Sequence, residues 1–454
     1  MPAPVHATTN PAPKPQPAHV TPASKYSIDA YLVEPSDVKP KATVTFSAEL
    51  RELMEELESH PGCELVLASA VPRFNTTPSG IFTVDLTLGG GWADNFESMV
   101  YGYGNSGKTT TILKAIAGIQ RKRPQHRCVL CDVETTFDPT WAEYHGVDLT
   151  RLQILRPSSA EEGADIMLGL TKCPDIAAIV LDSIPVFTPS KDFDDSLSDA
   201  VMATRARLMG RFSTNLLQSK AIERQKKSDL NPYGHDFMWF SVNSWRSKIG
   251  LVFGDPRTLP GGDWQHTFHR TKIEMRSKEQ SEILKAENEE ETPEDKAKKK
   301  KAKKGASVSH TEHEFTVAKA KIPGVRNGEF RMIMEPSHRL GLGAVDDAGP
   351  VGAWAKRLGV IRQSGSDLVS DVFDYRISGR EALENLIETD TEFGDWLRLA
   401  CMVKQRVALG MPPLPPDGYL VTPSVAPGRR KKPAPVALPL APRAPGGQLL
   451  FTRG

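Results

Sequence analysis

The sequence predicts an α/β fold in which a mainly parallel, twisted sheet carries helices on both faces. Short apolar stretches typical of buried strands alternate with longer stretches typical of helices. A glycine-rich turn follows the first of these strands and leads directly into a helix. The strands are expected at 98–101, 127–131, 177–181 and 237–242, and the helices at 109–120, 160–170 and 199–218.

The composition is that of a globular chain with more than one domain. Its 454 residues allow two or three domains of ordinary size. Lys and Arg (57) balance Asp and Glu (56), so the overall charge indicates neither a nucleic-acid nor an acidic partner. No apolar run is long enough to span a membrane, and five scattered Cys are no disulfide framework. We therefore expect a cytoplasmic protein without a membrane partner.

Proline-rich ends and a charged insert interrupt the alternating pattern. Nine prolines fall in residues 1–40 and eleven in residues 412–454. We predict that both segments are disordered tails, because they cannot bury enough apolar surface to offset the entropy of ordering. Residues 276–309 carry a run of acids and then a run of lysines, which is typical of a solvated loop. The flanking stretches suggest the expanded tip of a hairpin.

The remaining sequence divides into three parts. Residues 41–75 contain a capped amphipathic helix, which we expect to serve oligomerisation. Residues 76–336 form the α/β core, apart from the charged insert. Residues 337–411 have a helical pattern of their own and predict a small α-rich C-terminal domain. Its helices are expected at 351–358, 379–387 and 392–407.

A phosphate-binding loop follows the strand at 98–101. Residues 102–110 are Gly-Tyr-Gly-Asn-Ser-Gly-Lys-Thr-Thr, a complete G-x-x-x-x-G-K-T pattern. The glycines let backbone N–H groups close around phosphates, and the next helix adds its positive N-terminus. Lys108 would neutralise phosphate charge, and the Thr109 hydroxyl would bind Mg²⁺. The cofactors expected are ATP and Mg²⁺, and the residues expected to contact the nucleotide are Gly102, Gly104, Asn105, Ser106, Gly107, Lys108, Thr109 and Thr110.

Two carboxylates are expected beside this loop. Asp182 ends the apolar stretch 176–182, and the carboxyl end of a buried strand is the usual place for ligands in an open α/β sheet. There it could hold Mg²⁺, often through water. Glu134 follows the strand at 127–131 and could align the attacking water on the γ-phosphate. Asp132 is a close rival for that role, and an acid at a strand end can also serve solubility alone.

Cys128 and Cys131 have C-x-x-C spacing, but they lie within an expected strand without a second pair. We therefore expect buried structural thiols rather than a zinc or redox site. His266 and His269 lack a third ligand nearby, and Trp141 is by default a core residue.

Together these motifs resemble those of RecA-type DNA recombinases. The resemblance runs from about residue 46 to about residue 410, outside the charged insert. Beyond the phosphate loop and the strand-end acids, four segments carry it: 79–91 (SGIFTVDLTLGGG), 137–141 (FDPTW), 243–256 (NSWRSKIGLVFGDP) and 319–323 (KAKIP). The Lys-Ile-Gly loop is far more specific than the phosphate loop, which marks a vast superfamily.

The resemblance implies an ATP-dependent homologous recombinase in a bacterial or phage-infected cell, associated with the nucleoid. Members form helical filaments on single-stranded DNA with ATP between subunits, pair it with homologous double-stranded DNA and exchange strands. Glu134 matches the family's catalytic glutamate. Asp138 matches the acid that contacts adenine, and Trp141 falls where an aromatic ring stacks on the base. Lys319 and Lys321 match lysines that reach the neighbouring subunit's ATP.

The resemblance also places two DNA-binding loops. Residues 189–207 match the first, with Met202 as an intercalating side chain. Residues 245–262 match the second, with Ile249 as the intercalator. Apolar wedges that unstack bases and cations that hold phosphates bind DNA without reading its sequence. The other residues expected at DNA are Arg207, Trp245, Arg246, Lys248, Gly250, Arg257, Gly261 and Gly262.

Several departures are typical of a divergent member, which could be phage-encoded. Ser244 stands where bacterial RecA proteins have a glutamine that couples the γ-phosphate to the second DNA loop. Residues 221–236 look like an insertion. The C-terminal tail is basic, whereas bacterial RecA tails are typically acidic. Residues 447–451 (GQLLF) resemble, with one residue missing, peptides that dock on bacterial sliding clamps, so the clamp is a further candidate partner.

Two alternative functions stay open. A regulatory or accessory RecA-like protein would bind DNA or a polymerase without exchanging strands, and Ser244 and the clamp-type peptide favour it. A hexameric helicase motor could use the same core, but the helix ahead of the core and the Lys-Ile-Gly loop match recombinases better.

Overall fold

The computed structural model describes residues 47–58, 75–94, 96–190, 201–226, 228–231, 234–247, 257–278, 310–320, 326–373 and 375–411. The two predicted tails lie outside these ranges, as do residues 279–309 of the charged insert. The clamp-type peptide at 447–451 is therefore also outside the described part.

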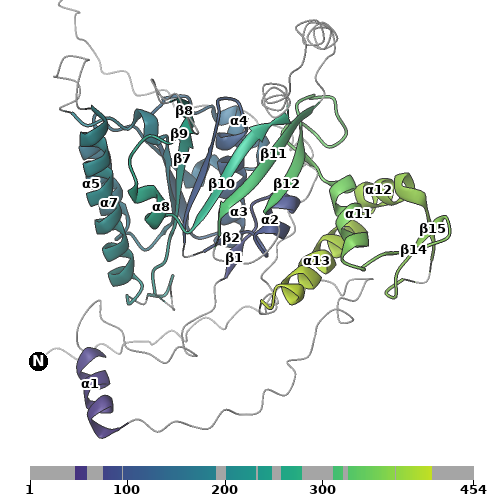
Figure 1. The fold of residues 1–454 in the computed structure, drawn as a ribbon, viewed down its shortest axis with the longest axis horizontal. Helices are drawn as coiled ribbons and strands as arrows, with labels where there is room; N and C mark the ends of the chain where they lie inside the picture. Colours follow the sequence, from purple (N-terminus) through teal and green to yellow (C-terminus); the bar gives the residue numbers. More distant parts are fainter. Residues whose placement is uncertain are drawn as a thin grey trace, which may run out of the picture.

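A sheet of nine strands forms the centre of the molecule (Figure 1). Its strands are β3 (Glu97–Gly102), β4 (Arg127–Asp132), β5 (Leu152–Leu155), β6 (Ile176–Asp182), β7 (Met238–Ser244), β10 (Thr271–Ser277), β11 (His310–Lys319), β12 (Asn327–Ile333) and β13 (Val345–Asp346). Their order is β13-β12-β11-β10-β3-β7-β6-β4-β5. The six strands from β10 to β5 in this order run parallel, and β11 to β13 add an antiparallel edge. The predicted α/β class is confirmed.

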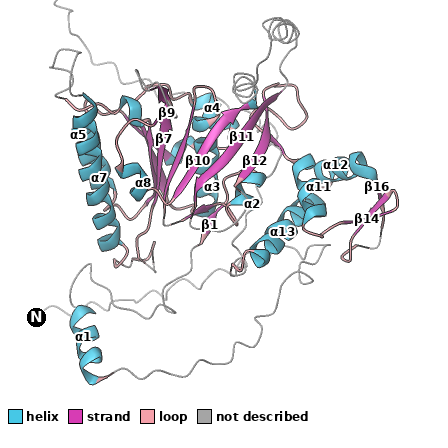
Figure 2. Ribbon diagram, viewed as in Figure 1, coloured by secondary structure: helices cyan, strands magenta, loops and turns pink. Residues whose placement is uncertain are grey.

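Helices cover both faces of this sheet (Figure 2). The alternation of side chains along a strand explains the two cores: Val100 packs into one, and its neighbours Met99 and Tyr101 pack into the other. The first core includes helices α2 (Phe82–Thr87), α3 (Lys108–Lys122) and α4 (Pro139–Tyr144). The second includes α5 (Ala160–Leu170), α7 (Val201–Glu223) and α8 (Trp264–Phe268).

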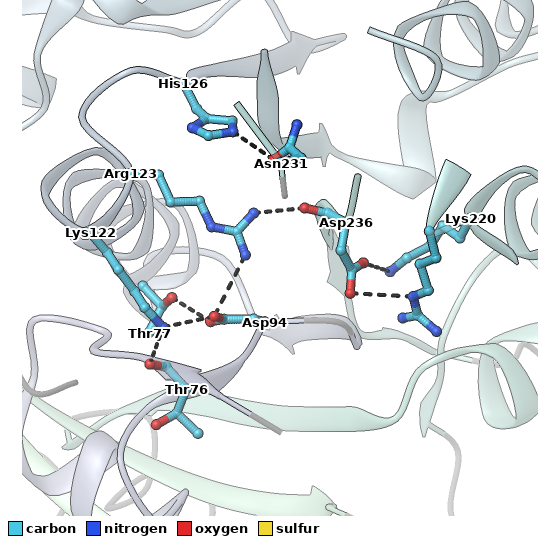
Figure 3. Close-up of polar contacts among 10 residues, drawn as sticks. Thr76, Thr77, Asp94, Lys122, Arg123, His126, Lys220, Asn231 and Asp236 are labelled. Carbon is cyan, nitrogen blue, oxygen red and sulfur yellow. Dashed lines mark hydrogen bonds and ion pairs between the residues drawn. The ribbon is translucent and has the colours of Figure 1, made fainter. Parts of the chain in front are cut away.

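Polar side chains join the C-terminal end of α3 to neighbouring segments (Figure 3). Asp94 accepts hydrogen bonds from Lys122 at 2.7 Å and from the Thr77 hydroxyl at 2.5 Å. The backbone carbonyl of Asp236 accepts from Arg123 at 2.7 Å. Asp236 belongs to the stretch 221–236, whose first residues extend α7 as far as Glu223. The expected insertion is thus tied to the end of α3.

The C-terminal part has its own apolar core. It contains α11 (Ala348–Arg357), α12 (Gly379–Thr389) and α13 (Thr391–Ala408), close to the three expected helices. It also contains a small antiparallel sheet that the sequence did not predict, formed by β14 (Arg362–Ser364), β15 (Asp367–Val369) and β16 (Ile377–Ser378). Phe82 and Leu86 of α2 pack into the same core and so join it to the α/β part.

Three further features belong to the described part of the chain. The expected N-terminal helix is α1 (Ala48–Glu58), where Leu50 and Leu53 are exposed. Strand β1 (Thr76–Thr77) pairs with β2 (Trp92–Ala93). Strands β10 and β11 pair antiparallel on either side of residues 279–309, as expected for a hairpin. Among the helices described, none combines the length and the apolar character needed to cross a bilayer.

Candidate nucleotide-binding site

The phosphate loop connects β3 to α3, as the motif predicts. Asn105 and Gly107 adopt left-handed backbone angles, with φ of 58° and 89°. Gly107 ends the loop and caps α3, where a side chain would be strained. Gly102 has no room for a side chain either, since an added Cβ would lie 2.1 Å from the carbonyl oxygen of Met275. The glycines therefore allow the turn and let neighbouring backbone approach closely.

Lys108 is the first residue of α3, and its charge interacts with those of two acids. Its ammonium donates a 2.5 Å hydrogen bond to the carbonyl oxygen of Tyr103. Burial lowers the pKa of Lys108, while the negative charges of Asp182 and Glu134 act against that shift. The structure thus brings together three of the residues that the sequence assigned to ATP chemistry.

Thr109 and Asp182 meet at the carboxyl end of β6. The Thr109 hydroxyl donates a 3.0 Å hydrogen bond to the Asp182 carboxylate. Burial raises the pKa of Asp182 to about 6, although the bond from Thr109 acts in the opposite direction. A hydroxyl and a carboxylate side by side form the oxygen-rich set that Mg²⁺ prefers. Thr109 lies in the first turn of α3, and Asp182 is the last residue of β6. The residues present therefore fit this ion.

The two rival carboxylates after β4 have different surroundings. Asp132 is buried and accepts hydrogen bonds from Arg156 at 2.8 Å and from the backbone N–H of Thr136 at 3.0 Å. Its carboxylate is thus occupied in shaping the loop that follows the strand. Glu134 is exposed, and its carboxylate accepts a hydrogen bond from the hydroxyl of Ser183. Ser183 is not among the site residues predicted from the sequence, although it directly follows Asp182.

The two residues expected at the base have structural contacts as well. Asp138 caps α4 by accepting hydrogen bonds from the N–H groups of Thr140 at 2.8 Å and Trp141 at 3.2 Å. Trp141 is half-buried and meets the ring of His145 edge to face, with centroids 4.5 Å apart. Their expected contacts with adenine remain predictions.

Lys319 does not join the phosphate loop of its own chain. In the sheet it pairs with Lys272, which is level with Met99 of β3. Met99 lies three residues before Gly102, or about 10 Å along the strand from the loop. The Lys319 ammonium donates a 2.5 Å hydrogen bond to the carbonyl oxygen of His266. Lys321 lies outside the described residues.

The first segment expected at DNA is partly helical. Residues 201–207 form the first turns of α7, so the helix expected at 199–218 begins within the segment matched to the first DNA-binding loop. The reason is that the chain from 201 to 209 contains neither glycine nor proline. Arg207 is exposed on this helix, and Met202 lies in its first turn. The remaining residues of the segment, 191–200, lie outside the described part.

Trp245 begins the second expected DNA loop, 245–262, and Arg257 lies within it, just after residues 248–256, which are outside the described part. The Trp245 indole N–H donates to Glu274 at 3.0 Å, and the Arg257 guanidinium lies 5.0 Å from the indole centroid. Arg257 also approaches Glu274 at 3.6 Å. Tyr101, next to Gly102 of the phosphate loop, meets the Trp245 ring edge-on at 5.2 Å. These contacts, which the sequence did not reveal, connect the phosphate-loop strand to Trp245 and Arg257 of the expected DNA loop.

The rest of that loop is described only in part. Arg246 is exposed in β8 (Arg246–Ser247), which pairs with β9 (Arg257–Thr258). Gly261 and Gly262 both have left-handed backbone angles. Lys248, Ile249 and Gly250 lie outside the described residues.

Cys128 and Cys131 are buried in β4, as expected of structural thiols. Burial raises the pKa of both thiols to about 12. His269 is also fully buried, between the Ser241 hydroxyl at 2.9 Å and the carbonyl oxygen of Gln265 at 3.2 Å. Contacts of this kind are those of core residues.

Comparison with known proteins agrees with the motifs. The RecA N-terminal domain model matches residues 49–320. The chain is 32% identical to Protein RecA of Bacillus mycoides over 209 residues, which cover 46% of this chain and 57% of that protein. It is 31% identical to Protein RecA of Mesomycoplasma hyopneumoniae over 235 residues, which cover 51% of this chain and 66% of that protein. The chain thus spans less than two thirds of these relatives. Since the family model covers more than half of its length, the chain belongs to the RecA family.

Proposed function

We propose that the protein is an ATP-dependent homologous recombinase that forms filaments on single-stranded DNA and pairs it with homologous double-stranded DNA. The observation that carries this proposal is the convergence of Lys108, Thr109, Asp182 and Glu134 at one edge of the parallel sheet of a RecA-family chain. The contacts around Trp245 support it, because they join this edge to the second expected DNA loop.

In the proposed site the phosphate loop and Lys108 hold the phosphates of ATP. Backbone N–H groups of the loop and the N-terminus of α3 offset the negative charge. Thr109 and Asp182 would hold Mg²⁺, which neutralises charge that develops on the phosphate oxygens. Glu134 would accept a hydrogen bond from the attacking water, with Ser183 fixing the orientation of its carboxylate.

We also propose that Lys319 and Lys321 act on the ATP of a neighbouring subunit. The sheet register supports this for Lys319, because it lies about 10 Å along the strand direction from the loop of its own chain. A site completed by a neighbour would make ATP binding depend on assembly. A filament that assembles on DNA and later releases it requires such a dependence.

On the DNA side, we propose that 189–207 and 245–262 contact the strand. Exposed Arg207 and Arg246 suit phosphates. Trp245 is better suited to support the loop than to stack on bases, because Arg257 covers its ring and Glu274 takes its N–H. The glutamine that couples the γ-phosphate to the second DNA loop in bacterial RecA proteins is replaced here by Ser244. We therefore propose that a cluster at the same loop couples nucleotide binding to DNA binding instead. This cluster consists of Tyr101, Trp245, Arg257 and Glu274.

Strand exchange with the full chain tests the proposal. A single-stranded circle and a homologous linear duplex should yield joint molecules in the presence of ATP and Mg²⁺. Lys108→Ala should yield none. Filaments without joint molecules would instead support an accessory protein, and closed rings in electron micrographs would support a helicase motor.

A further inference from the structure

His313 packs beneath the phosphate loop from strand β11. Its side chain is buried, and its ring stacks on Phe330 with centroids 5.1 Å apart. Its Nδ1 lies 3.1 Å from the carbonyl oxygen of Ser106, and its Nε2 lies 2.9 Å from the hydroxyl of Thr311. A Cβ added to Gly107 would come within 2.9 Å of the imidazole. The ring therefore fits closely against the last peptide of the loop.

The two partners define the state of the imidazole. The carbonyl oxygen of Ser106 can only accept a hydrogen bond, so Nδ1 carries the proton. In the neutral ring Nε2 then accepts from the Thr311 hydroxyl. Burial lowers the pKa of His313, which favours this neutral form near pH 7.

The contact with Ser106 also sets the direction of the next amide group. A trans peptide unit is planar, and its C=O and N–H point in opposite directions. Because the carbonyl of Ser106 points to His313, the N–H of Gly107 points away from the imidazole. Gly107 is the residue before Lys108 and the N-cap of α3, where backbone N–H groups bind phosphate.

We propose that His313 is a positioning residue for the phosphate loop. It holds the peptide between Ser106 and Gly107 so that the Gly107 N–H faces the phosphates of the nucleotide. It does not touch the nucleotide and acts only through the loop. The inference rests on the proposed nucleotide site, and it adds a residue from a strand that the sequence motif does not include.

Two substitutions separate the hydrogen bond from the packing. His313→Phe keeps an aromatic ring on Phe330 but removes the donor, whereas His313→Asn keeps an N–H close to the position of Nδ1. His310→Phe on the same strand is the matched control, since His310 is partly exposed and pairs with Glu312 instead. The readout is the affinity of the full chain for ADP with Mg²⁺, measured by titration calorimetry, with thermal unfolding as a check on folding.

We expect His313→Phe to bind ADP about tenfold more weakly than the wild type, because the substitution removes one buried hydrogen bond that orients the loop. His313→Asn should stay within about threefold of the wild type, and His310→Phe should match it. The inference is overturned if folded His313→Phe binds like the wild type, or if His313→Asn is as weak as His313→Phe.

Nitrogen NMR of the wild-type imidazole gives a test that needs no variant. The ring of His313 should carry its proton on Nδ1 at pH 7.5, and a proton found on Nε2 alone would overturn the inference even if the Phe variant fails to fold. If the wild type itself does not bind ADP, the proposed function fails first, so the two failures can be told apart.

Discussion

The Thr109 hydroxyl donates a 3.0 Å hydrogen bond to the Asp182 carboxylate, across 73 residues of sequence. Thr109 lies in the first turn of α3, which follows β3 and the phosphate loop. Asp182 ends the buried strand β6, which is two places from β3 in the sheet. Parallel strands bring their carboxyl ends to the same edge, so the fold itself brings these two oxygen-bearing side chains together.

Lys108→Ala should weaken the binding of ADP or ATP at least about 100-fold, because the ammonium that donates to the Tyr103 carbonyl of the loop is lost with its charge. Titration calorimetry measures the affinity. Lys172→Ala changes an exposed lysine and should leave it unchanged. Nucleotide binding by Lys108→Ala that equals the wild type would show that the nucleotide binds elsewhere.

Glu134→Gln should bind ATP normally and hydrolyse it about 100-fold to 10,000-fold more slowly, since the amide cannot accept the proton of the attacking water. Phosphate release is the measurement. The control is Glu143→Gln, which changes an exposed acid on α4. Hydrolysis at the wild-type rate by Glu134→Gln would contradict this role for Glu134 and favour Asp132 as the residue that aligns the water.

Trp245→Phe should weaken binding of single-stranded DNA about threefold to tenfold while ATP binding stays unchanged. The phenyl ring can still lie under Arg257, but the hydrogen bond to Glu274 is lost. Fluorescence anisotropy of a labelled oligonucleotide gives the affinity. Trp354→Phe in α11 makes the same change far from this cluster. Equal DNA affinity for the wild type and Trp245→Phe would contradict the proposed role of this cluster in coupling ATP binding to DNA binding.

His269 should make folding sensitive to acid. Burial lowers its pKa from 6.5 to about 3, so only the unfolded chain takes up a proton between these values. The free energy of unfolding therefore falls as the pH drops below about 6.5, and this group accounts for about 1 kcal/mol of the loss between pH 6 and pH 5. Urea unfolding of His269→Gln at both pH values should show a loss smaller by that amount. An identical loss in wild type and variant would refute this assignment.

The sequence predicted those features that follow from local pattern. The four strands and three helices that the sequence predicts for the core lie within a few residues of the observed bounds, because apolar runs and the phosphate-loop glycines are local signals. The strands β14 to β16 were missed, since they are two or three residues long and β14 is fully exposed. They have no apolar alternation to detect.

The site was predictable only in part, for a related reason. Lys108 and Thr109 stand in a contiguous motif, and Asp182 ends an apolar run. The contacts that distinguish the surroundings of Asp132 from those of Glu134 come instead from Arg156 and Ser183, which are brought close only by folding. Likewise, Glu274 and His313 lie on strands whose pairing with the loop is not visible in their own sequence.

The most direct test of the central claim is ATP hydrolysis by the full chain with and without single-stranded DNA, with electron micrographs of the same samples. The proposed recombinase should hydrolyse ATP much faster with DNA and form helical filaments, and Lys108→Ala should do neither. Neither stimulation nor filaments from the wild-type protein, with nucleotide binding intact, would contradict the claim.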